Sequence, residues 1–362
     1  FTGSLDISGS RISFDDGKQN IAIGTNSIGV SGFTGNQNIA IGENAMLDAN
    51  GANTGYNIVI GYNAGKSFGA NNVYSNILIG RQAGMNINSG DASNTIAIGT
   101  NAGIDITSGQ RNLLIGTEAG TNISTSDDNT AIGYNAMHGN DSTAGTGTGR
   151  NTGMGSSVLY AITTGQQNVA IGTSAGSTLT TTSHTVLIGH NAGLAINSTD
   201  ANGTVAIGME AGKAITSGAS NVAIGYEALK TTTTGLRNIA IGYEAMHDTD
   251  AGSNSSDSDN NIFIGYTAGG GAWANAKSEF NVAIGSNVMQ GVLNGAVYNS
   301  ALGYFALASV TSGDKNVAVG SEAGYAITSA TNNTFVGYQS GFALIDGTSN
   351  TAMGMLSLST DC

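Results

Sequence analysis

Two short segments of the chain are spaced like known catalytic and phosphate-binding motifs. Residues 172–176, GTSAG, fit the G-x-S-x-G pattern that holds a nucleophilic serine between a strand and a helix. Residues 61–67, GYNAGKS, resemble a phosphate-binding loop but have three residues between the glycines instead of four. Both segments are copies of a phrase that recurs along the chain. We therefore interpret Ser174 and Lys66 as repeat positions and expect no catalytic residue.

Metal ligands are equally sparse in the sequence. The acidic segment 248–260, DTDAGSNSSDSDN, is the best candidate for weak cation binding, but no G-G-x-G-x-D calcium repeat occurs. The single cysteine is Cys362, and no pair of histidines has zinc-ligand spacing with cysteine support. The histidines are His138, His184, His190 and His247. We predict neither a metal site nor a cofactor.

Glutamate and tyrosine recur at fixed places, two residues and one residue after a repeated glycine. Paired carboxylates can hydrolyse glycosidic bonds, and exposed stacked tyrosines can bind sugars. Because Glu interchanges freely with Asn in its column, we interpret the glutamates as a solvated ladder. We favour packing or an interface for the tyrosines, and we expect the chain not to be an enzyme. The glutamates are Glu118, Glu210, Glu227, Glu244 and Glu322, and the tyrosines are Tyr62, Tyr134, Tyr226, Tyr243, Tyr266, Tyr304 and Tyr338.

The composition excludes further classes of function. A net charge of −13 leaves no basic footprint for phosphates, so no nucleic-acid partner is expected. No apolar run is long enough to span a bilayer, so we expect no membrane insertion. The 362 residues include 56 glycines, no proline and only 10% charged residues, which indicates close backbone packing rather than disorder. The chain starts at Phe1 without a visible signal peptide, so we expect a mature product or a piece of a longer protein.

One phrase, N-x-A-I-G, fills most of the chain. Aligned on its glycine it occurs in nineteen copies, and nine of the eighteen spacings are 17 residues. Four residues before the glycine stands Asn in sixteen copies and Thr in three. Such internal periodicity is the signature of a repeat architecture. The glycines are Gly24, Gly42, Gly61, Gly80, Gly99, Gly116, Gly133, Gly155, Gly172, Gly189, Gly208, Gly225, Gly242, Gly265, Gly285, Gly303, Gly320, Gly337 and Gly354.

The phrase reads as a short β-branched strand between two corner residues. Gly suits a corner that needs positive φ or a close backbone approach, and Asn can bond along a stacked ladder. Segments such as 104–109, 213–218 and 325–330 read as a weaker second strand. Stacking these units predicts an all-β fold, a parallel β-solenoid or β-roll of about nineteen coils. Residues 1–19 are expected to form an N-terminal strand or connector, and 20–362 a single repeat domain.

Both faces of the predicted strand are apolar, which points to self-association. Alternate side chains of a strand point to opposite faces, so we expect the two Ile/Val columns to fill the coil and the middle column to face outward. A continuous apolar stripe marks an interaction surface, and we predict a homo-oligomer with rods side by side along this column. The alternative is that a loop or the second strand covers the stripe within one chain. The interface alanines are predicted as Ala22, Ala40, Ala97, Ala131, Ala170, Ala206, Ala223, Ala240, Ala283, Ala301, Ala318 and Ala352.

The repeated N-x-A-I-G-x-x-A phrase on an acidic, Gly-rich chain resembles the head repeats of YadA-like trimeric autotransporter adhesins and similar repeats in bacteriophage tail fibres. The resemblance covers roughly residues 20–358 and implies a homotrimer of left-handed parallel β-rolls. It departs in period, because the adhesin heads use a unit near 14 residues and this chain favours 17 to 19. The opening segment 1–14, FTGSLDISGSRISF, looks like strand segments of phage tail-fibre proteins. It favours a phage fibre over an adhesin.

The resemblance therefore implies a structural protein, the trimeric shaft of a phage tail fibre involved in host attachment. Its partners would be two copies of itself, other fibre or tail proteins, and a host cell-surface receptor or glycan bound through loops or a distal tip. The location would be the virion or the extracellular surface. The alternative is the head of a bacterial surface adhesin that binds matrix or cells. A polysaccharide-cleaving or ice-binding solenoid fits less well. The glutamates read as a solvated ladder, and an ice-binding face would need a regular Thr array, whereas the threonines are frequent but irregular.

Overall fold

The computed structural model describes most of the chain and places it in two compact units, residues 1–181 and 182–362. Regular structure in the described residues is almost all strand, with one short 3-10 helix, η1 (Thr199–Ala201). The described residues are 5–7, 10–14, 18–29, 33–50, 54–69, 73–88, 92–139, 149–249, 254 and 257–359.

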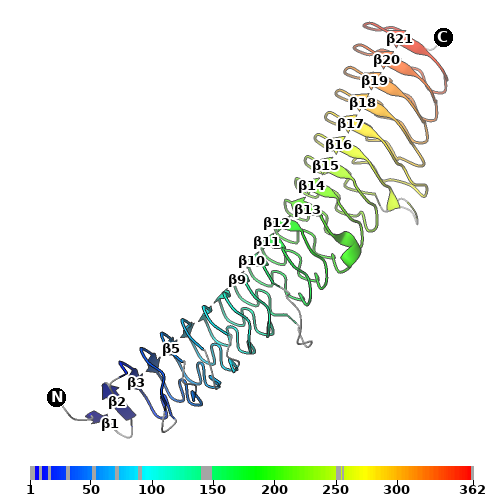
Figure 1. The fold of residues 1–362 in the computed structure, drawn as a ribbon. Coiled ribbons are helices and arrows are strands. Elements are labelled where there is room, and N and C mark those ends of the chain that lie inside the picture. Colours follow the sequence, from blue (N-terminus) through cyan, green and yellow to red (C-terminus); the bar gives the residue numbers. More distant parts are fainter. Residues whose placement is uncertain are drawn as a thin grey trace. The chain divides into compact units, whose positions relative to one another are not determined.

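The first unit begins with an antiparallel hairpin and continues as a parallel ladder (Figure 1). Strand β1 (Leu5–Ile7) pairs with β2 (Ser10–Phe14), and β2 pairs antiparallel with the first strand of the ladder. Each later strand pairs in parallel with the next. These strands are β3 (Ile21–Ile23), β4 (Ile39–Ile41), β5 (Ile58–Ile60), β6 (Ile77–Ile79), β7 (Ile96–Ile98), β8 (Leu113–Ile115), β9 (Thr130–Ile132), β10 (Thr152–Met154) and β11 (Val169–Ile171).

The second unit repeats the parallel ladder with one strand for each copy of the phrase (Figure 1). In the pair β14–β15, Ala223 lies opposite Ala240, so identical repeat positions stack on one another. With nineteen such parallel strands in the described residues of the two units, the predicted all-β solenoid is confirmed. The strands are β12 (Val186–Ile188), β13 (Val205–Ile207), β14 (Val222–Ile224), β15 (Ile239–Ile241), β16 (Ile262–Ile264), β17 (Val282–Ile284), β18 (Ser300–Leu302), β19 (Val317–Val319), β20 (Thr334–Val336) and β21 (Thr351–Met353).

The side of the coil opposite the strand is built from turns rather than from the expected second strand. Residues 104–109, 213–218 and 325–330 form turns and bends, although their backbones still bond to the next coil, as from Thr107 N–H to the carbonyl oxygen of Ser124 (2.8 Å). Two left-handed positions lie two and four residues after each repeated glycine, just before these segments, for example Glu244 and Met246, both with φ 49°. Such residues turn the chain too tightly for an extended strand.

The expected orientation of the strand faces was wrong. The middle residue of the strand is buried inside its own coil, while the two flanking residues point outward and are partly exposed. Ala22 is half-buried, Ala301 and Ala352 are nearly inaccessible, and the other nine predicted interface alanines are fully inaccessible within a single chain. A three-residue strand has one inward and two outward positions, and a narrow roll accepts the smallest side chain inside. Eleven of these alanines therefore belong to the core of a coil and cannot contact a neighbouring chain, while Ala22 is partly exposed.

The interior of each coil keeps a similar filling, because a large side chain at one position occurs together with a small one at another. In one coil Val59 and Phe68 are fully buried, and a Cβ atom added at Gly65 would lie 2.8 Å from the Phe68 ring. In another coil the middle residue is Ala240, and Met246 fills the space instead. A narrow interior that continues from coil to coil is closely packed only if the total side-chain volume is similar in each coil.

The Gly corner and the Asn corner, which recur in the copies of the phrase, have different physical roles. Gly225 has φ +133°, and a Cβ atom there would lie 2.2 Å from the carbonyl oxygen of Gly242, so only glycine lets successive coils stack. At the other corner, Asn57 donates its backbone N–H (3.1 Å) and its side-chain amide (3.0 Å) to Oδ1 of Asn38. The same bonds join many successive Asn corners within each unit, and they satisfy buried polar groups that would otherwise destabilise the fold.

Candidate functional site

The largest candidate surface is the outward face of the parallel sheet, which we call the outer face. It consists of the two residues that flank the middle residue of each strand, and most of them are Ile or Val. They are half-buried in most strands and exposed in β17 to β19 and in β21, where Met353 is 71% exposed. An apolar surface that continues from coil to coil is typical of a protein–protein interface.

The second unit alone carries enough of this surface for a stable contact. Its ten strands offer twenty outward positions, and seventeen hold Ile, Val, Leu or Met. A standard protein interface uses about 20–30 residues on each partner. The polar exceptions, Ser300, Thr334 and Thr351, lie in the last four strands. The sequence thus identified an apolar stripe but assigned it to the wrong column.

A network of ion pairs lies on a corner of the second unit. Lys213 Nζ and Lys230 Nζ lie 2.8 and 3.1 Å from the two carboxylate oxygens of Glu210. Lys230 also pairs with Glu227 (2.9 Å), whose other oxygen lies 2.7 Å from Nε2 of His247. The Glu210 and Glu227 side chains are only 14% and 12% exposed, so the expectation of a solvated glutamate ladder is wrong for this pair.

These contacts change the acidity of the carboxylates. Hydrogen bonding to Lys213, helped by Lys230, lowers the pKa of Glu210 from 4.5 to about 2. The pKa of Glu227 is lowered despite partial burial, since Lys230, Tyr226 and His247 all bond to its carboxylate. Each carboxylate stays ionised and paired, which is the opposite of the raised pKa that a general acid needs.

Three of the seven tyrosines that follow the repeated glycine stack on one another, and the other four, Tyr62, Tyr134, Tyr304 and Tyr338, are exposed. Tyr226 and Tyr243 stack with ring centroids 5.0 Å apart, and Tyr243 and Tyr266 with centroids 5.3 Å apart. Their exposed fractions rise from 36% to 44% and 55% along this row. A sugar stacks on the face of an aromatic ring, but here each shared face is occupied by the neighbouring tyrosine. The row therefore presents ring edges and hydroxyl groups to solvent.

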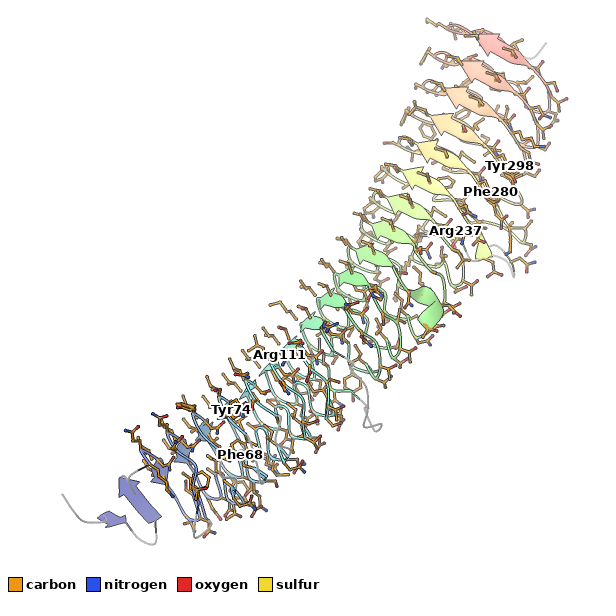
Figure 2. All side chains as sticks on the ribbon, viewed as in Figure 1. Phe68, Tyr74, Arg111, Arg237, Phe280 and Tyr298 are labelled. Carbon is orange, nitrogen blue, oxygen red and sulfur yellow. The ribbon has the colours of Figure 1, made fainter. Side chains whose placement is uncertain are left out.

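Other ladders on the surface link neighbouring coils without forming a cleft. The guanidinium of Arg111 donates to both carboxylate oxygens of Asp128 (2.6 and 3.1 Å), which lowers the pKa of Asp128. Phe280 and Tyr298 stack with centroids 5.1 Å apart on successive coils of the second unit (Figure 2). Because Arg111 and Asp128 are well exposed, their ion pair contributes little to stability.

The chemistry suggested by the short sequence motifs finds no support in the local geometry. Ser174 lies in the turn after β11 at φ 56°, and no helix follows it, so the strand-to-helix turn of a nucleophile elbow is not formed. Lys66 follows Gly65 in the equivalent turn after β5. Among the residues that the structure describes, no three His, Cys, Asp or Glu side chains gather to hold a metal ion. Parts of the acidic segment 248–260 and Cys362 lie outside the described residues.

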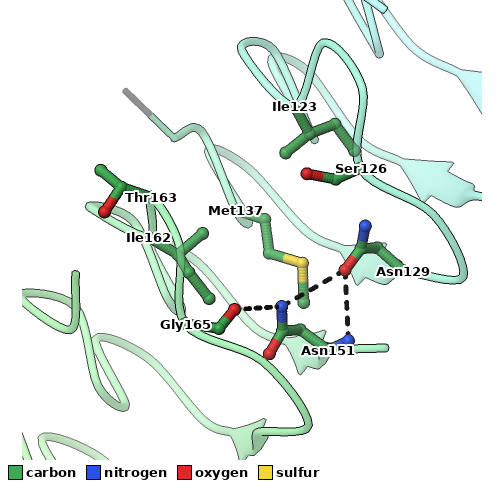
Figure 3. A pocket seen from close by; sticks show the side chains of 8 residues that line it. All are labelled: Ile123, Ser126, Asn129, Met137, Asn151, Ile162, Thr163 and Gly165. Carbon is green, nitrogen blue, oxygen red and sulfur yellow. Dashed lines mark hydrogen bonds between the residues drawn. The ribbon is translucent and has the colours of Figure 1, made fainter. Parts of the chain in front are cut away.

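A small hollow in the first unit marks the insertion between β9 and β10 (Figure 3). Asn151 donates its backbone N–H to Oδ1 of Asn129 (3.1 Å), but its side-chain amide reaches that oxygen only at 3.4 Å. The free space is about 10 Å³, close to the minimum for a single water molecule, so the hollow cannot hold a substrate. It is lined by Ile123, Ser126, Asn129, Met137, Asn151, Ile162, Thr163 and Gly165.

No helix within the described ranges combines the length and apolar character needed to cross a membrane.

The candidate interaction surface that the sequence analysis did not find is the outer face. One signal in the sequence could have revealed it. Where the middle residue of the strand is small, as at Ala240, the residue four after the glycine is large, as at Met246, which indicates that both fill the inside of the coil.

Comparison of the chain with models of protein families and with curated proteins found no match.

Proposed function

We propose that the chain is a structural protein, the shaft of a homotrimeric fibre in which three β-rolls lie side by side through their outer faces. The observation that carries this proposal is the outer face itself, with two outward apolar residues in fourteen of the nineteen parallel strands. A single chain that exposed such a surface in water would associate, because each Å² of apolar surface that the contact removes from water contributes about 25 cal/mol.

The repeat that resembles phage tail fibres supports a tail-fibre shaft that takes part in host attachment. Stacked coils suit this role, since hydrogen bonds link each coil to the next and the strength of the shaft does not depend on one site. The receptor-binding function would lie on the inserted loops or at a distal tip, and other fibre or tail proteins would join the ends. The virion is then the proposed location.

Sedimentation velocity and native mass spectrometry test the assembly directly. At micromolar concentration the unaltered protein is expected to be a trimer. The double variant Ile224→Asp/Ile241→Asp places two carboxylates on the outer face and is expected to give folded monomers, which circular dichroism would verify. The matched control is Tyr298→Asp, an equally apolar-to-acidic change at a position that is 54% exposed and off the outer face. A monomeric unaltered protein, or a trimer that survives the double substitution, would refute the proposed packing.

A further inference from the structure

Three tyrosines form one row on a corner of the second unit. Each of Tyr226, Tyr243 and Tyr266 follows the repeated glycine of its coil, and the three coils are consecutive. Neighbouring rings are inclined by only 14° and 12°, with centroids 5.0 and 5.3 Å apart, and all three side chains are exposed. No other ring pair in the part of the chain that the structure describes consists of two tyrosines. In this row, phenols thus lie against one another and open to a dissolved reagent.

Each of the first two phenols has a proton acceptor beside it. The Tyr226 hydroxyl donates to the carboxylate of Glu227, and this bond raises the pKa of the hydroxyl. The Tyr243 hydroxyl donates in the same way to Glu244, with the same effect on its pKa. A phenol that loses one electron becomes a strong acid, and a carboxylate already bonded to its hydroxyl can take the proton at once. Tyr226 and Tyr243 are therefore prepared to form neutral radicals when an oxidant removes an electron.

We propose that Tyr226 and Tyr243 form a site of oxidative cross-linking, at which a one-electron oxidant joins the two rings through their ortho carbons. Each phenol gives one electron to the oxidant and its hydroxyl proton to the adjacent carboxylate. The two radicals then combine in one carbon–carbon bond. The hydrogen on each bonded carbon leaves as a proton, and each ring oxygen takes up a proton. In total, two electrons and two protons are lost for one new bond.

The pair Tyr226 and Tyr243 is favoured over the pair Tyr243 and Tyr266. Its centroids lie closer, at 5.0 Å against 5.3 Å, and the residue after Tyr266 is Thr267, which has no carboxylate. Coupling requires the rings to turn out of the stack, which exposed side chains do by rotation about their two χ bonds. The new bond joins two coils that are otherwise linked by hydrogen bonds, and it closes a short loop, which lowers the entropy of the unfolded chain. This modification goes beyond the proposed structural role and needs no contact between chains.

Photo-oxidation of the intact protein with tris(bipyridine)ruthenium(II) and persulfate tests the site. The ruthenium complex removes the electrons, and persulfate accepts them and is reduced to sulfate. Trypsin then leaves Tyr226 on peptide 214–230 and both Tyr243 and Tyr266 on peptide 238–277. Mass spectrometry is expected to find these two peptides joined, with two hydrogen atoms fewer than their sum, and fragmentation should place the link at Tyr243. On a denaturing gel the linked protein should still run as a single chain.

Three variants make the test specific. Tyr243→Phe keeps an aromatic ring in the stack but removes one phenol, so the joined peptides are expected to disappear. The control Tyr304→Phe removes an exposed phenol of the same column outside the row and should leave the yield unchanged. Glu244→Gln removes a proton acceptor and is expected to slow the linking several-fold, with recovery when imidazole is added as an external base.

Four results would overturn the assignment. The first is that the two peptides are still joined in Tyr243→Phe. The second is that links form only between chains, and the third is that Glu244→Gln links at an unchanged rate. The fourth is an unlinked protein under conditions that couple N-acetyltyrosine.

Discussion

Asn299 donates both its backbone N–H (3.0 Å) and its side-chain amide (3.1 Å) to the single oxygen Oδ1 of Asn281. The other amide hydrogen of Asn299 goes to the carbonyl oxygen of Gly313 (2.8 Å), and its own Oδ1 accepts the same two bonds from Asn316. One buried side chain thus links three coils, and every polar atom it carries has a partner. A ladder of this kind fixes the spacing of the coils as well as the corner.

Replacing Asn299 with Leu is expected to destabilise the protein by about 3 kcal/mol or more. The change leaves the buried carbonyl oxygen of Gly313 and the buried backbone N–H of Asn316 without this bond, and each such group costs about 1–3 kcal/mol. Oδ1 of Asn281 keeps only the bond from the backbone N–H of residue 299. Urea denaturation followed by circular dichroism measures the loss. The control is Ser312→Ala, an exposed position shortly before the next Asn corner, Asn316. Equal stability of the two variants would mean that water replaces the ladder bonds.

Thr95→Asn is expected to stabilise the protein by about 1 kcal/mol. Thr95 interrupts the Asn ladder, its hydroxyl oxygen is buried without a hydrogen-bond partner, and only its backbone N–H reaches Oδ1 of Asn76 (2.9 Å). An Asn at this position would add the missing side-chain bond. The comparison variant is Thr204→Asn, which should gain less, because the Thr204 hydroxyl already donates to the carbonyl oxygen of Ala201 (2.9 Å). Thermal unfolding of both variants gives the difference, and a larger gain at position 204 would contradict the explanation.

The repeat fold could be predicted well from the sequence because the N-x-A-I-G phrase recurs at nearly regular spacing. The Asn and Gly columns fix the corners, and the β-branched residues between them can only form a short strand. The inside and outside of that strand could not be predicted in the same way. Alternation shows that Ile239 and Ile241 share a face and that Ala240 lies on the other, but it does not say which face is inside. Burial of the small residue becomes evident only when Met246 is counted as part of the same core.

The ion-pair corner was missed for a related reason. Glu227 and Lys230 are three residues apart, but Lys230 meets Glu210 and Glu227 meets His247 only when neighbouring coils are stacked in register. In the sequence the glutamates appeared as interchangeable with Asn, which is typical of a solvated position. The long side chains five residues after the glycine carried the missing signal.

The ion pairs of Glu210 predict a specific dependence of stability on pH. The two lysines lower the pKa of Glu210 from its ordinary value of 4.5, which applies to the unfolded chain, to about 2 in the folded protein. The ion pairs of Glu210 therefore stabilise the fold fully above about pH 4.5. That contribution, about 1 kcal/mol, should disappear as the pH falls from about 4.5 to about 2. The difference in free energy of unfolding between the unaltered protein and Glu210→Gln should therefore be constant above pH 5 and shrink below it. Urea titrations at several pH values measure it, with the exposed Glu43→Gln as control. A difference that grows on acidification would contradict the assigned pairing.

The compensation of core volumes gives the sharpest test of which face is inside. In the coil of β6 the middle residue is Leu78, and a Cβ atom added at Gly84 would lie 2.8 Å from its Cδ2 atom. In the coil of β15 the sizes are reversed, with Ala240 and Met246 at the same two positions. Ala240→Leu should therefore overpack the coil and destabilise it by about 1–3 kcal/mol.

The double variant Ala240→Leu/Met246→Gly copies the arrangement of the β6 coil and should recover most of that loss. Glycine is also compatible with φ 49° at position 246. Met246→Gly alone should leave a cavity and cost about 2–5 kcal/mol, so the double-mutant cycle should show strong favourable coupling. As a control, Ile241→Leu on the outer face should change the stability of the isolated coil stack by less than about 0.5 kcal/mol. If the two substitutions at 240 and 246 were simply additive, the residues would not share one core, and the middle column would have to be placed on the outside after all.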